Sequence, residues 1–283
     1  MIACDLCGSD NSRHILSSKH LDGALVRCSN CGFYYVGSRH SQLTFGGDDP
    51  EAVARRVRQA NCGFQNLRLE EEHRLALLNA RWRMDIVRQF CPSGLLLEVG
   101  CARGDFLSIA REAFNVYGVE PNPELAAFAR RVATVHEGVV ETLPATGFDV
   151  AASFHVIEHV DSPRRFLRAI AQRVRSGGIL VIETPNIASF AYRLFRSHWR
   201  EFIPEHYYFF DPDTIHRLMQ SEGLKVERII NVGKYASVEL MLNRAARYSN
   251  AFRPVNSIAR SVGLSELTFR ITPGDIMLVV ARK

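Results

Sequence analysis

The sharpest change in the hydrophobic pattern of the chain falls within residues 95–107. Residues 95–99 (LLLEV) form an apolar run interrupted by one acid, which is typical of a strand buried on both faces of a sheet. A short loop with Gly100 and Gly104 follows, and apolar residues then return at helical spacing. The pattern predicts a strand, a tight turn and a helix start. Because such a turn exposes backbone N–H groups and glycine admits a ligand closely, the loop is predicted to cradle a nucleotide.

Strand patterns and capped helices alternate along the rest of the chain. Strand-like apolar runs lie at residues 116–119, 134–136, 148–153, 179–183, 224–232 and 276–281. Cap and stop residues predict helices that begin at Asn122, Ser162 and Asp211, the second closing at Gly177 and the third at Gly223. This order predicts an α/β fold with a doubly wound, seven-stranded, mostly parallel sheet whose last strand enters antiparallel. Ligands bind such a sheet at the carboxyl ends of its strands.

The pattern upstream of this region predicts an accessory part. Residues 41–50, rich in Gly, Asp and Ser, are typical of a linker or loop. A helix is predicted to follow and to end before Pro92, and its apolar stripe consists of Leu75, Leu78, Trp82, Ile86 and Phe90. We expect this helix to dock the N-terminal part onto the main domain. The predicted division is a small module (1–40), a linker and helical cap (41–93), and a main domain (94–283) with a helical insertion at about 233–275.

Composition narrows the class of protein without naming it. The chain has 283 residues, of which 47% are hydrophobic and 23% charged, as is usual for a globular protein. No apolar run reaches the roughly 18–20 residues that a membrane helix needs, and the N-terminus lacks the pattern of a signal peptide. We therefore expect a cytoplasmic protein. The net charge of +5 is spread over arginines at 55–58, 130–131 and 164–168. These arginines are interpreted as solvated helix faces, with a patch for an anionic partner as the alternative.

Two carboxylates flank the predicted nucleotide loop. The third small position of a dinucleotide-binding G-x-G-x-x-G loop is occupied here by Asp105. Glu98 and Asp105 would repel a pyrophosphate but suit a ligand that carries a sulfonium and an ammonium group, although Arg103 offsets part of their field. Glu120, at the end of the next predicted strand, is placed to accept hydrogen bonds from both ribose hydroxyls. The charges thus favour a cationic nucleoside over NAD.

Together these residues resemble the class I S-adenosylmethionine-dependent methyltransferases. The stretch EVGCARG from Glu98 to Gly104 is similar to that family's first motif, Glu/Asp-x-Gly-x-Gly-x-Gly, with Ala102 in place of the middle glycine. Glu120 is similar to its ribose-binding acid, and the resemblance spans about residues 95–212. It implies S-adenosylmethionine as cofactor, with an adenine contact from the main chain after the third strand. The cofactor-binding residues that it implies are Glu98, Gly100, Cys101, Gly104, Asp105, Glu120, Pro121, Val140 and Phe154.

Four cysteines in the first 31 residues predict a metal site. Cys4-x-x-Cys7 and Cys28-x-x-Cys31 are twenty residues apart, and each pair is followed directly by a glycine where the backbone must turn. Four thiolates on two such knuckles match tetrahedral Zn(II), and no position is left open for a substrate, so the zinc would be structural. The alternative is two disulfides, which a reducing cytoplasm disfavours. Residues 33–36 (FYYV) are expected to pack on the next domain rather than stack on a base. The layout resembles deoxysugar C-methyltransferases that carry a four-cysteine module.

Two later segments are predicted to contact the methyl acceptor. His155-x-x-Glu158-His159 follows the fourth predicted strand. It reads literally as an inverted zinc-protease motif, but the resemblance favours an acceptor-side segment in which His155 faces the acceptor while Glu158 and His159 orient the loop. The Asn/Asp-Pro-Pro-Tyr/Phe segment of N-methylating relatives is absent there, which disfavours transfer to an amine of a base.

Residues 198–210 are unusually rich in aromatic rings and histidines. They are interpreted as the wall of a pocket for a flat or sugar-like acceptor, and the alternative is that the rings only pack against the first predicted helix. The Pro-Glu-His sequence in this run resembles sugar methyltransferases that use a Glu-His pair for acid and base work. The predicted catalytic residues are therefore His206 as base, Glu205 as its neighbour, and His155.

The predicted function is methyl transfer to an oxygen or carbon of a small molecule, such as a sugar or another precursor of a secondary metabolite or polysaccharide. Two alternatives stay open. One is an RNA methyltransferase that holds phosphates with the cysteine module and the arginine-rich helices, and the other is a non-catalytic scaffold. Intact Glu98, Gly100, Gly104 and Glu120 disfavour the scaffold.

Overall fold

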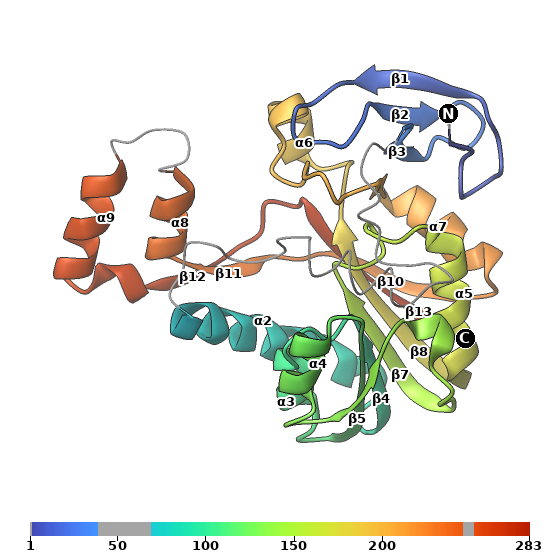
Figure 1. Cartoon of the computed structure of the whole chain (residues 1–283), viewed down its shortest axis with the longest axis horizontal. Coiled ribbons are helices and arrows are strands. Elements are labelled where there is room, and N and C mark those ends of the chain that lie inside the picture. The colour runs from blue at the N-terminus through green and yellow to red at the C-terminus, as the bar shows by residue number, and fades with distance from the viewer. Residues whose placement is uncertain (1, 39–68, 246–251) are drawn as a thin grey trace.

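The computed structural model describes residues 2–38, 69–245 and 252–283. A seven-stranded sheet forms its centre, with the strand order β10-β13-β8-β7-β4-β5-β6 (Figure 1). Its strands are β4 (Gly94–Val99), β5 (Phe114–Glu120), β6 (Thr134–Glu137), β7 (Phe148–Phe154), β8 (Val174–Pro185), β10 (Lys225–Asn231) and β13 (Ile276–Arg282). Strands β4 to β8 pair in parallel, and β13 is antiparallel to both β8 and β10. The predicted doubly wound, mostly parallel sheet is confirmed.

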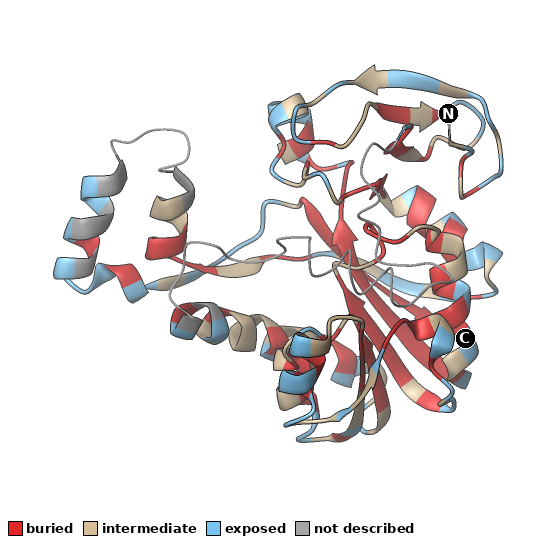
Figure 2. Cartoon of the chain, in the orientation of Figure 1, coloured by how far each residue is buried: buried red, intermediate tan, exposed pale blue. Residues whose placement is uncertain are grey.

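Helices cover both faces of this sheet. One face packs against α2 (Leu69–Phe90), α3 (Asp105–Ala110) and α4 (Pro123–Ala129). The other packs against α5 (Pro163–Arg173) and α7 (Pro212–Ser221). Figure 2 shows the buried residues concentrated in the central strands and in the sides of the helices that face them. None of the helices within the described residues is both long and apolar enough to cross a membrane.

Local capping sets where three of these helices begin. The side chain of Asn122 accepts from the backbone N–H groups of Glu124 and Leu125, and Ser162 caps α5 in the same way. In each case a proline follows the cap residue, where its missing N–H costs no hydrogen bond. The predicted starts of α4, α5 and α7 are confirmed.

The predicted end of the second capped helix is wrong. Helix α5 ends at Arg173, and β8 begins at the next residue, so Gly177 (φ +75°) lies inside a strand. A Cβ on the neighbouring Gly178 would lie 2.6 Å from Val174 Cγ1 and 2.9 Å from Asp149 O. The two glycines therefore allow the irregular start of β8 to approach β7 closely, at the point where the register between the two strands shifts.

The N-terminal module forms a four-stranded antiparallel sheet with a later part of the chain. Its strands are β1 (Ser12–Leu16), β2 (Leu25–Cys28), β3 (Tyr34–Val36) and β9 (Tyr208–Phe209). Phe33 is 1% exposed and stacks on Tyr208, with ring centroids 5.8 Å apart. The expectation that residues 33–36 pack on the next domain is confirmed.

Helix α2 does not dock this module, contrary to expectation. It packs on α3 and on the sheet face opposite the module, and the core cluster that contains Met84 and Val87 includes no residue of the module (Figure 1). Besides its pairing with β9, the module is docked by the start of α5. The backbone N–H of Arg164 donates to Asp5 Oδ2 at 2.9 Å, and Ser162 Oγ donates to Asp5 Oδ1 at 2.7 Å. The N-terminal module thus sits on the α5 side of the sheet.

Residues 233–245 and 252–275 form an arm that projects from the sheet (Figure 1). Two antiparallel strands, β11 (Lys234–Ser237) and β12 (Thr268–Ile271), form its base, and α8 (Val238–Ala245) and α9 (Phe252–Ser261) form its tip. The sequence pattern predicts the helices but not the strand pair. The predicted linker at 41–50 and the arginines at 55–58 lie outside the described residues.

Candidate active site

The predicted nucleotide loop joins β4 to α3 at the carboxyl edge of the sheet. Gly100 (φ +79°), Ala102 (φ +46°) and Gly104 (φ +82°) all have left-handed backbone conformations. A Cβ on Gly100 would lie 2.4 Å from Val156 Cγ2, and one on Gly104 would lie 3.1 Å from the Cα of Ala129. Both glycines are thus required by close packing, and the loop after β7 that holds Val156 lies directly against the β4 loop.

Two buried carboxylates lie beside this loop. Each oxygen of Glu120 accepts one backbone N–H at 2.9 Å, from Ala102 and from Asn122. Glu98 is 5% exposed, and its Oε2 is one of the buried polar side-chain atoms without a hydrogen-bond partner in the described chain. An unsatisfied buried oxygen next to a glycine cradle fits a bound group that carries N–H donors or positive charge. The residues present therefore fit S-adenosylmethionine.

Burial disfavours the charged forms of Glu98 and Glu120. Burial raises the pKa of Glu98 well above its usual range, and the charges of Asp105 and Glu120 add to this, while Arg83 opposes it. Burial also raises the pKa of Glu120, against the two N–H groups that it accepts. Asp105 is held by a 2.8 Å hydrogen bond with His73 Nδ1 of α2.

The other residues implied by the resemblance surround the same edge of the sheet. Cys101 is buried, and a Cβ on Gly118 would lie 2.6 Å from its Sγ. Val140 lies in a short 3₁₀ turn after β6 and is buried. Phe154 ends β7, and its ring lies 4.8 Å from that of Phe106. The last member of the set, Pro121, directly follows Glu120.

A buried polar network follows β7 and β8. His155 has a positive φ of 58°, its Nδ1 lies 3.0 Å from Glu158 Oε1, and its Nε2 lies 2.9 Å from Glu183 Oε1. Burial and Lys234 oppose protonation of this ring, but the carboxylates of Glu158 and Glu183 outweigh them and raise the pKa of His155. The structure thus places His155 between two acids.

Two cations of this network are not indicated by any sequence motif. Arg83 of α2 forms a two-point ion pair with Glu183 of β8, with Nε at 2.9 Å from Oε2. Its guanidinium also lies 4.3 Å from the centre of the Phe154 ring. Burial lowers the pKa of Lys234, the first residue of β11, and the carboxylate of Glu183 works against this shift. The apolar stripe at i, i+3 and i+4 spacing identifies only the buried face of α2. The role of Arg83 becomes visible only in the folded structure, through its ion pair with Glu183.

His206 lies in the same region, whereas Glu205 contributes mainly its backbone. The rings of His159 and His206 are 4.5 Å apart, and burial lowers the pKa of both to about 3. The backbone carbonyl of Glu205 accepts from His159 Nδ1 at 2.9 Å. The side chain of Glu205 itself is half-buried. Of the three predicted catalytic residues, the structure brings His155 and His206 into one buried cluster.

The aromatic run consists of core residues rather than the walls of an open pocket. Its fully buried rings are Trp199, Phe202, Tyr207, Tyr208, Phe209 and Phe210. Trp199 packs edge-on against Phe202 at 5.4 Å, and Phe33 of the N-terminal module packs against Phe210 at 5.0 Å. The alternative of plain packing therefore holds for these rings, although their partner is the N-terminal module and not α2.

The four cysteines converge as two knuckles. Their ligand atoms all lie within 4.8 Å of one another, with Sγ to Sγ distances of 3.4 Å for Cys4 and Cys31 and 3.5 Å for Cys7 and Cys28. The glycines that follow Cys7 and Cys31 have φ of +74° and +78°. The cysteines are not joined in disulfides. This donor set and spacing fit one tetrahedral ion.

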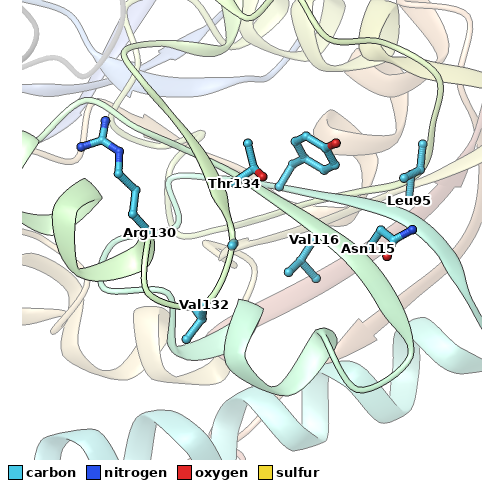
Figure 3. A pocket seen from close by; sticks show the side chains of 8 residues that line it. Leu95, Asn115, Val116, Arg130, Val132 and Thr134 are labelled. Carbon is cyan, nitrogen blue, oxygen red and sulfur yellow. The ribbon is translucent and has the colours of Figure 1, made fainter.

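A separate pocket lies at the opposite end of the strands. Figure 3 shows Leu95, Asn115 and Thr134, which lie at or near the amino ends of β4, β5 and β6, around this hollow. None of the predicted site residues lines it. Because parallel sheets bind ligands at their carboxyl ends, we do not assign the cofactor to this pocket.

The fold, the glycine cradle and the buried acids fit a methyltransferase that uses a cationic nucleoside as methyl donor. Residues 72–229, more than half of the chain, match the family described as methyltransferase domain. The chain belongs to the class I S-adenosylmethionine-dependent methyltransferases, which confirms the resemblance seen in its motifs.

Relatives support the same family over part of the chain. The chain is 27% identical over 187 residues to the mitochondrial ubiquinone biosynthesis O-methyltransferase of Schizosaccharomyces pombe, which covers 62% of this chain and 67% of that protein. It is 34% identical over 107 residues to a probable S-adenosylmethionine-dependent methyltransferase of Mycobacterium tuberculosis, covering 36% and 39% of the two chains. Less than half of that second protein's length is thus represented.

A solved structure shows the same fold. A methyltransferase from Archaeoglobus fulgidus has a TM-score of 0.51 at 20% identity, covering 74% of this chain and 94% of its own. At this identity the likeness concerns the fold alone.

Proposed function

We propose that this protein transfers the methyl group of S-adenosylmethionine to an oxygen or carbon of a small acceptor bound beside His155 and His206. The observation that carries the proposal is the pair of buried carboxylates, Glu98 and Glu120, beside a left-handed glycine loop. The site residues are those named from the motifs: Glu98, Gly100, Cys101, Gly104, Asp105, Glu120, Pro121, Val140 and Phe154 for the cofactor.

The transfer is an in-line displacement at the sulfonium methyl group. With S-adenosylmethionine bound, the acceptor's nucleophilic atom would bond to the methyl carbon, the electron pair of the C–S bond would go to sulfur, and the acceptor's proton would pass to a base, for which the predicted residue is His206. Alignment of the two reactants accounts for roughly 7–11 kcal/mol of the barrier. The loop with His155 supports this geometry because Val156 lies against Gly100, which places the two loops side by side.

On the acceptor side we assign His155 and His206 to acceptor contact and Glu205 to positioning. Glu205 holds the ring of His159 through its backbone carbonyl. Oxygen as the atom methylated is supported by the relative named as a ubiquinone biosynthesis O-methyltransferase, whereas the N-terminal cysteine layout supports a sugar-like acceptor methylated at carbon. We also propose that Cys4, Cys7, Cys28 and Cys31 bind a structural Zn(II) and that residues 1–40, 41–93 and 94–283 are the module, the cap and the methyltransferase domain.

Titration with labelled S-adenosylmethionine tests the cofactor assignment. Glu120→Ala removes two acceptor atoms for ribose hydroxyls, and hydrogen bonds to charged groups contribute about 1.5–3 kcal/mol each, so affinity is expected to fall at least 10-fold. Glu112→Gln is the matched control because Glu112 is exposed and lies between α3 and β5, the strand that ends at Glu120. Equal affinity of Glu120→Ala and the control would defeat the cofactor assignment.

An RNA acceptor is the second candidate. It is supported by 30% identity over 118 residues to a tRNA U34 carboxymethyltransferase of Shewanella baltica, covering 36% of each chain. RNA binding through arginines would weaken steeply with salt. A filter-binding series from low to moderate salt would show that slope if RNA is the acceptor, and no binding at low salt would exclude this candidate.

A further inference from the structure

A second group of metal-binding side chains lies at the acceptor edge of the sheet. Glu158, His159 and His206 each offer a ligand atom, and these three atoms lie within 4.8 Å of one another. Two come from the loop after β7 and one from the segment before β9, and the backbone N–H of Tyr207 ties the two segments by donating to Glu158 O at 2.9 Å. All three side chains are buried.

The orientation of both imidazoles is fixed by backbone carbonyls. His159 Nδ1 donates to Glu205 O at 2.9 Å, and His206 Nδ1 donates to Glu201 O at 2.6 Å. With Nδ1 as the protonated nitrogen, Nε2 carries the lone pair in each neutral ring. Metal-binding histidines have this arrangement, in which the second nitrogen donates to a carbonyl or carboxylate. Both rings are therefore already in the tautomer that a metal ion requires.

We propose that Glu158, His159 and His206 bind a divalent transition-metal ion, at a site distinct from the four cysteines. Two imidazoles and one carboxylate suit ions such as Mn²⁺, Fe²⁺, Co²⁺ or Zn²⁺ rather than Mg²⁺ or Ca²⁺. Metal–nitrogen bonds of about 2.1 Å place two ligands of one ion at most about 4.2 Å apart, so the three side chains need to close in only slightly.

Charges of both signs act on the three residues: the positive charge of Lys234 acts on His206, and Glu158 supplies the negative charge that an added cation needs. Glu158 contacts the ring of His155 through Oε1 and accepts from Thr184 Oγ1 at 3.1 Å through Oε2. The ion competes with His155 for Glu158, and His155 keeps its 2.9 Å contact with Glu183. After the exchange the carboxylate of Glu158 has the ion, and the imidazole of His155 has its ion-pair contact with Glu183.

With the ion bound, both ring nitrogens of His206 are occupied, so His206 acts on the acceptor through the metal. Three protein ligands leave open positions on the ion for this purpose. An acceptor oxygen bound there would lose its proton more easily, because a metal ion lowers the pKa of a coordinated hydroxyl group. This step rests on the proposed function, and it narrows the acceptor to a molecule that offers an oxygen to a transition metal. The metal site itself rests only on the geometry of the three side chains.

Metal content of the full chain tests the proposal. After incubation with Co²⁺ and gel filtration, elemental analysis gives the ions bound per chain, and sulfur-to-cobalt charge-transfer absorption reports the cysteine site separately. We expect one ion at the cysteines and one more without thiolate absorption. His206→Gln should lose the second ion and keep the thiolate bands, whereas His198→Gln, an exposed histidine of the same segment, should keep both.

The wild-type result decides the matter even if His206→Gln fails to fold. Cobalt bound to wild type only in proportion to the thiolate bands would overturn the proposal, and so would a second ion that Glu158→Gln and His206→Gln both retain. Titration with S-adenosylmethionine is run in parallel. Cofactor binding without the second ion refutes the metal site alone, and a second ion without cofactor binding refutes the proposed function alone.

Discussion

Ala102 occupies a backbone conformation that suits glycine better. Its φ of +46° is left-handed, and the hydrogen bond that its backbone N–H donates to Glu120 at 2.9 Å stabilises this conformation. A side chain in this region costs roughly 1–2 kcal/mol, part of which glycine loses again through the greater freedom of the unfolded chain.

Ala102→Gly is therefore expected to raise the free energy of unfolding by about 0.5–1 kcal/mol. Urea denaturation would measure it. Ala127→Gly, at an exposed position within α4, is the matched control and should lower stability by a similar amount, since glycine is unfavourable inside a helix. If Ala102→Gly lowered the free energy of unfolding as much as the control does, the backbone at Ala102 would not be strained.

Protonation of Glu98 should be linked to cofactor binding. Burial raises the pKa of this carboxyl, so part of the free protein holds it protonated at a pH where a free glutamate is ionised. The charged groups that face it are Arg83, Asp105 and Glu120, and a bound sulfonium or ammonium adds positive charge, which favours the ionised form. Binding is then expected to release protons, and affinity should rise with pH through the raised pKa and level off above it.

Calorimetry in buffers of different ionisation enthalpy would measure the protons released. The release should fall in Glu98→Gln and stay unchanged in Glu112→Gln, whose side chain is exposed. Some release should remain in Glu98→Gln because the pKa of Glu120 is raised as well. Identical proton release by wild type and Glu98→Gln would show that this carboxylate does not sense the cofactor's charge.

At the scale of elements, helix α7 shows how local sequence fixes a boundary. Asp211 Oδ1 accepts from the backbone N–H of Thr214 at 2.7 Å, and Thr214 Oγ1 accepts from the backbone N–H of Asp211 at 2.9 Å, which forms a capping box. Asp211→Ala should lower the free energy of unfolding by about 1 kcal/mol. Asp213→Ala, two residues later on the exposed face, should cost clearly less when both are compared by denaturant titration. Equal losses would assign the effect to charge near the helix start rather than to the cap.

Elements that depend on local pattern were predictable, and those that depend on distant partners were not. The caps at Asn122 and Ser162 bond only to residues two or three positions later, so the local sequence is enough to predict where these helices begin. Strand β9 has two residues and exists because Tyr208 pairs with Tyr35, far away in sequence. The prediction of a helix stop at Gly177 is wrong because its left-handed backbone (φ +75°) lies in the irregular start of β8, where the next residue, Gly178, packs against β7.

The same division holds for the candidate site. Glu98, Gly100 and Glu120 follow from one strand, one turn and the next strand, so a local motif identifies them. Arg83 and Lys234 lie on α2 and β11, and only the folded chain brings them to Glu183. The pocket wall predicted for the aromatic run fails for a related reason: these rings interrupt the aliphatic pattern because they pack on the distant N-terminal module, where Phe33 stacks on Tyr208.

At the scale of the whole molecule, the cysteine module is connected to the acceptor side by a continuous path. Cys28 ends β2, β2 pairs with β3, and β3 pairs with β9. The backbone N–H of Val36 donates to Tyr207 O, and the N–H of Tyr207 donates to Glu158 O, both at 2.9 Å. The loop between β4 and α3 is held mainly by β5, because the backbone N–H groups of Gly100 and Cys101 both donate to Val119 O, and its contact with this path is the packing of Val156 against Gly100.

Loss of the proposed ion from the four cysteines should therefore disturb residues 206–210 before the loop between β4 and α3. A segment this small has too little core to fold alone, and ligation of zinc by such peptides contributes about 10–16 kcal/mol.

Amide hydrogen exchange should show lost protection at residues 206–210 after Cys28→Ser, with residues 95–104 unchanged. The affinity for S-adenosylmethionine should stay within about threefold of wild type, or about 0.6 kcal/mol. Cys91→Ser, a half-buried cysteine outside the cluster, is the control. Equal loss of protection in both segments would mean that the module stabilises the whole sheet, and unchanged exchange at 206–210 would mean that β9 holds its place without the metal.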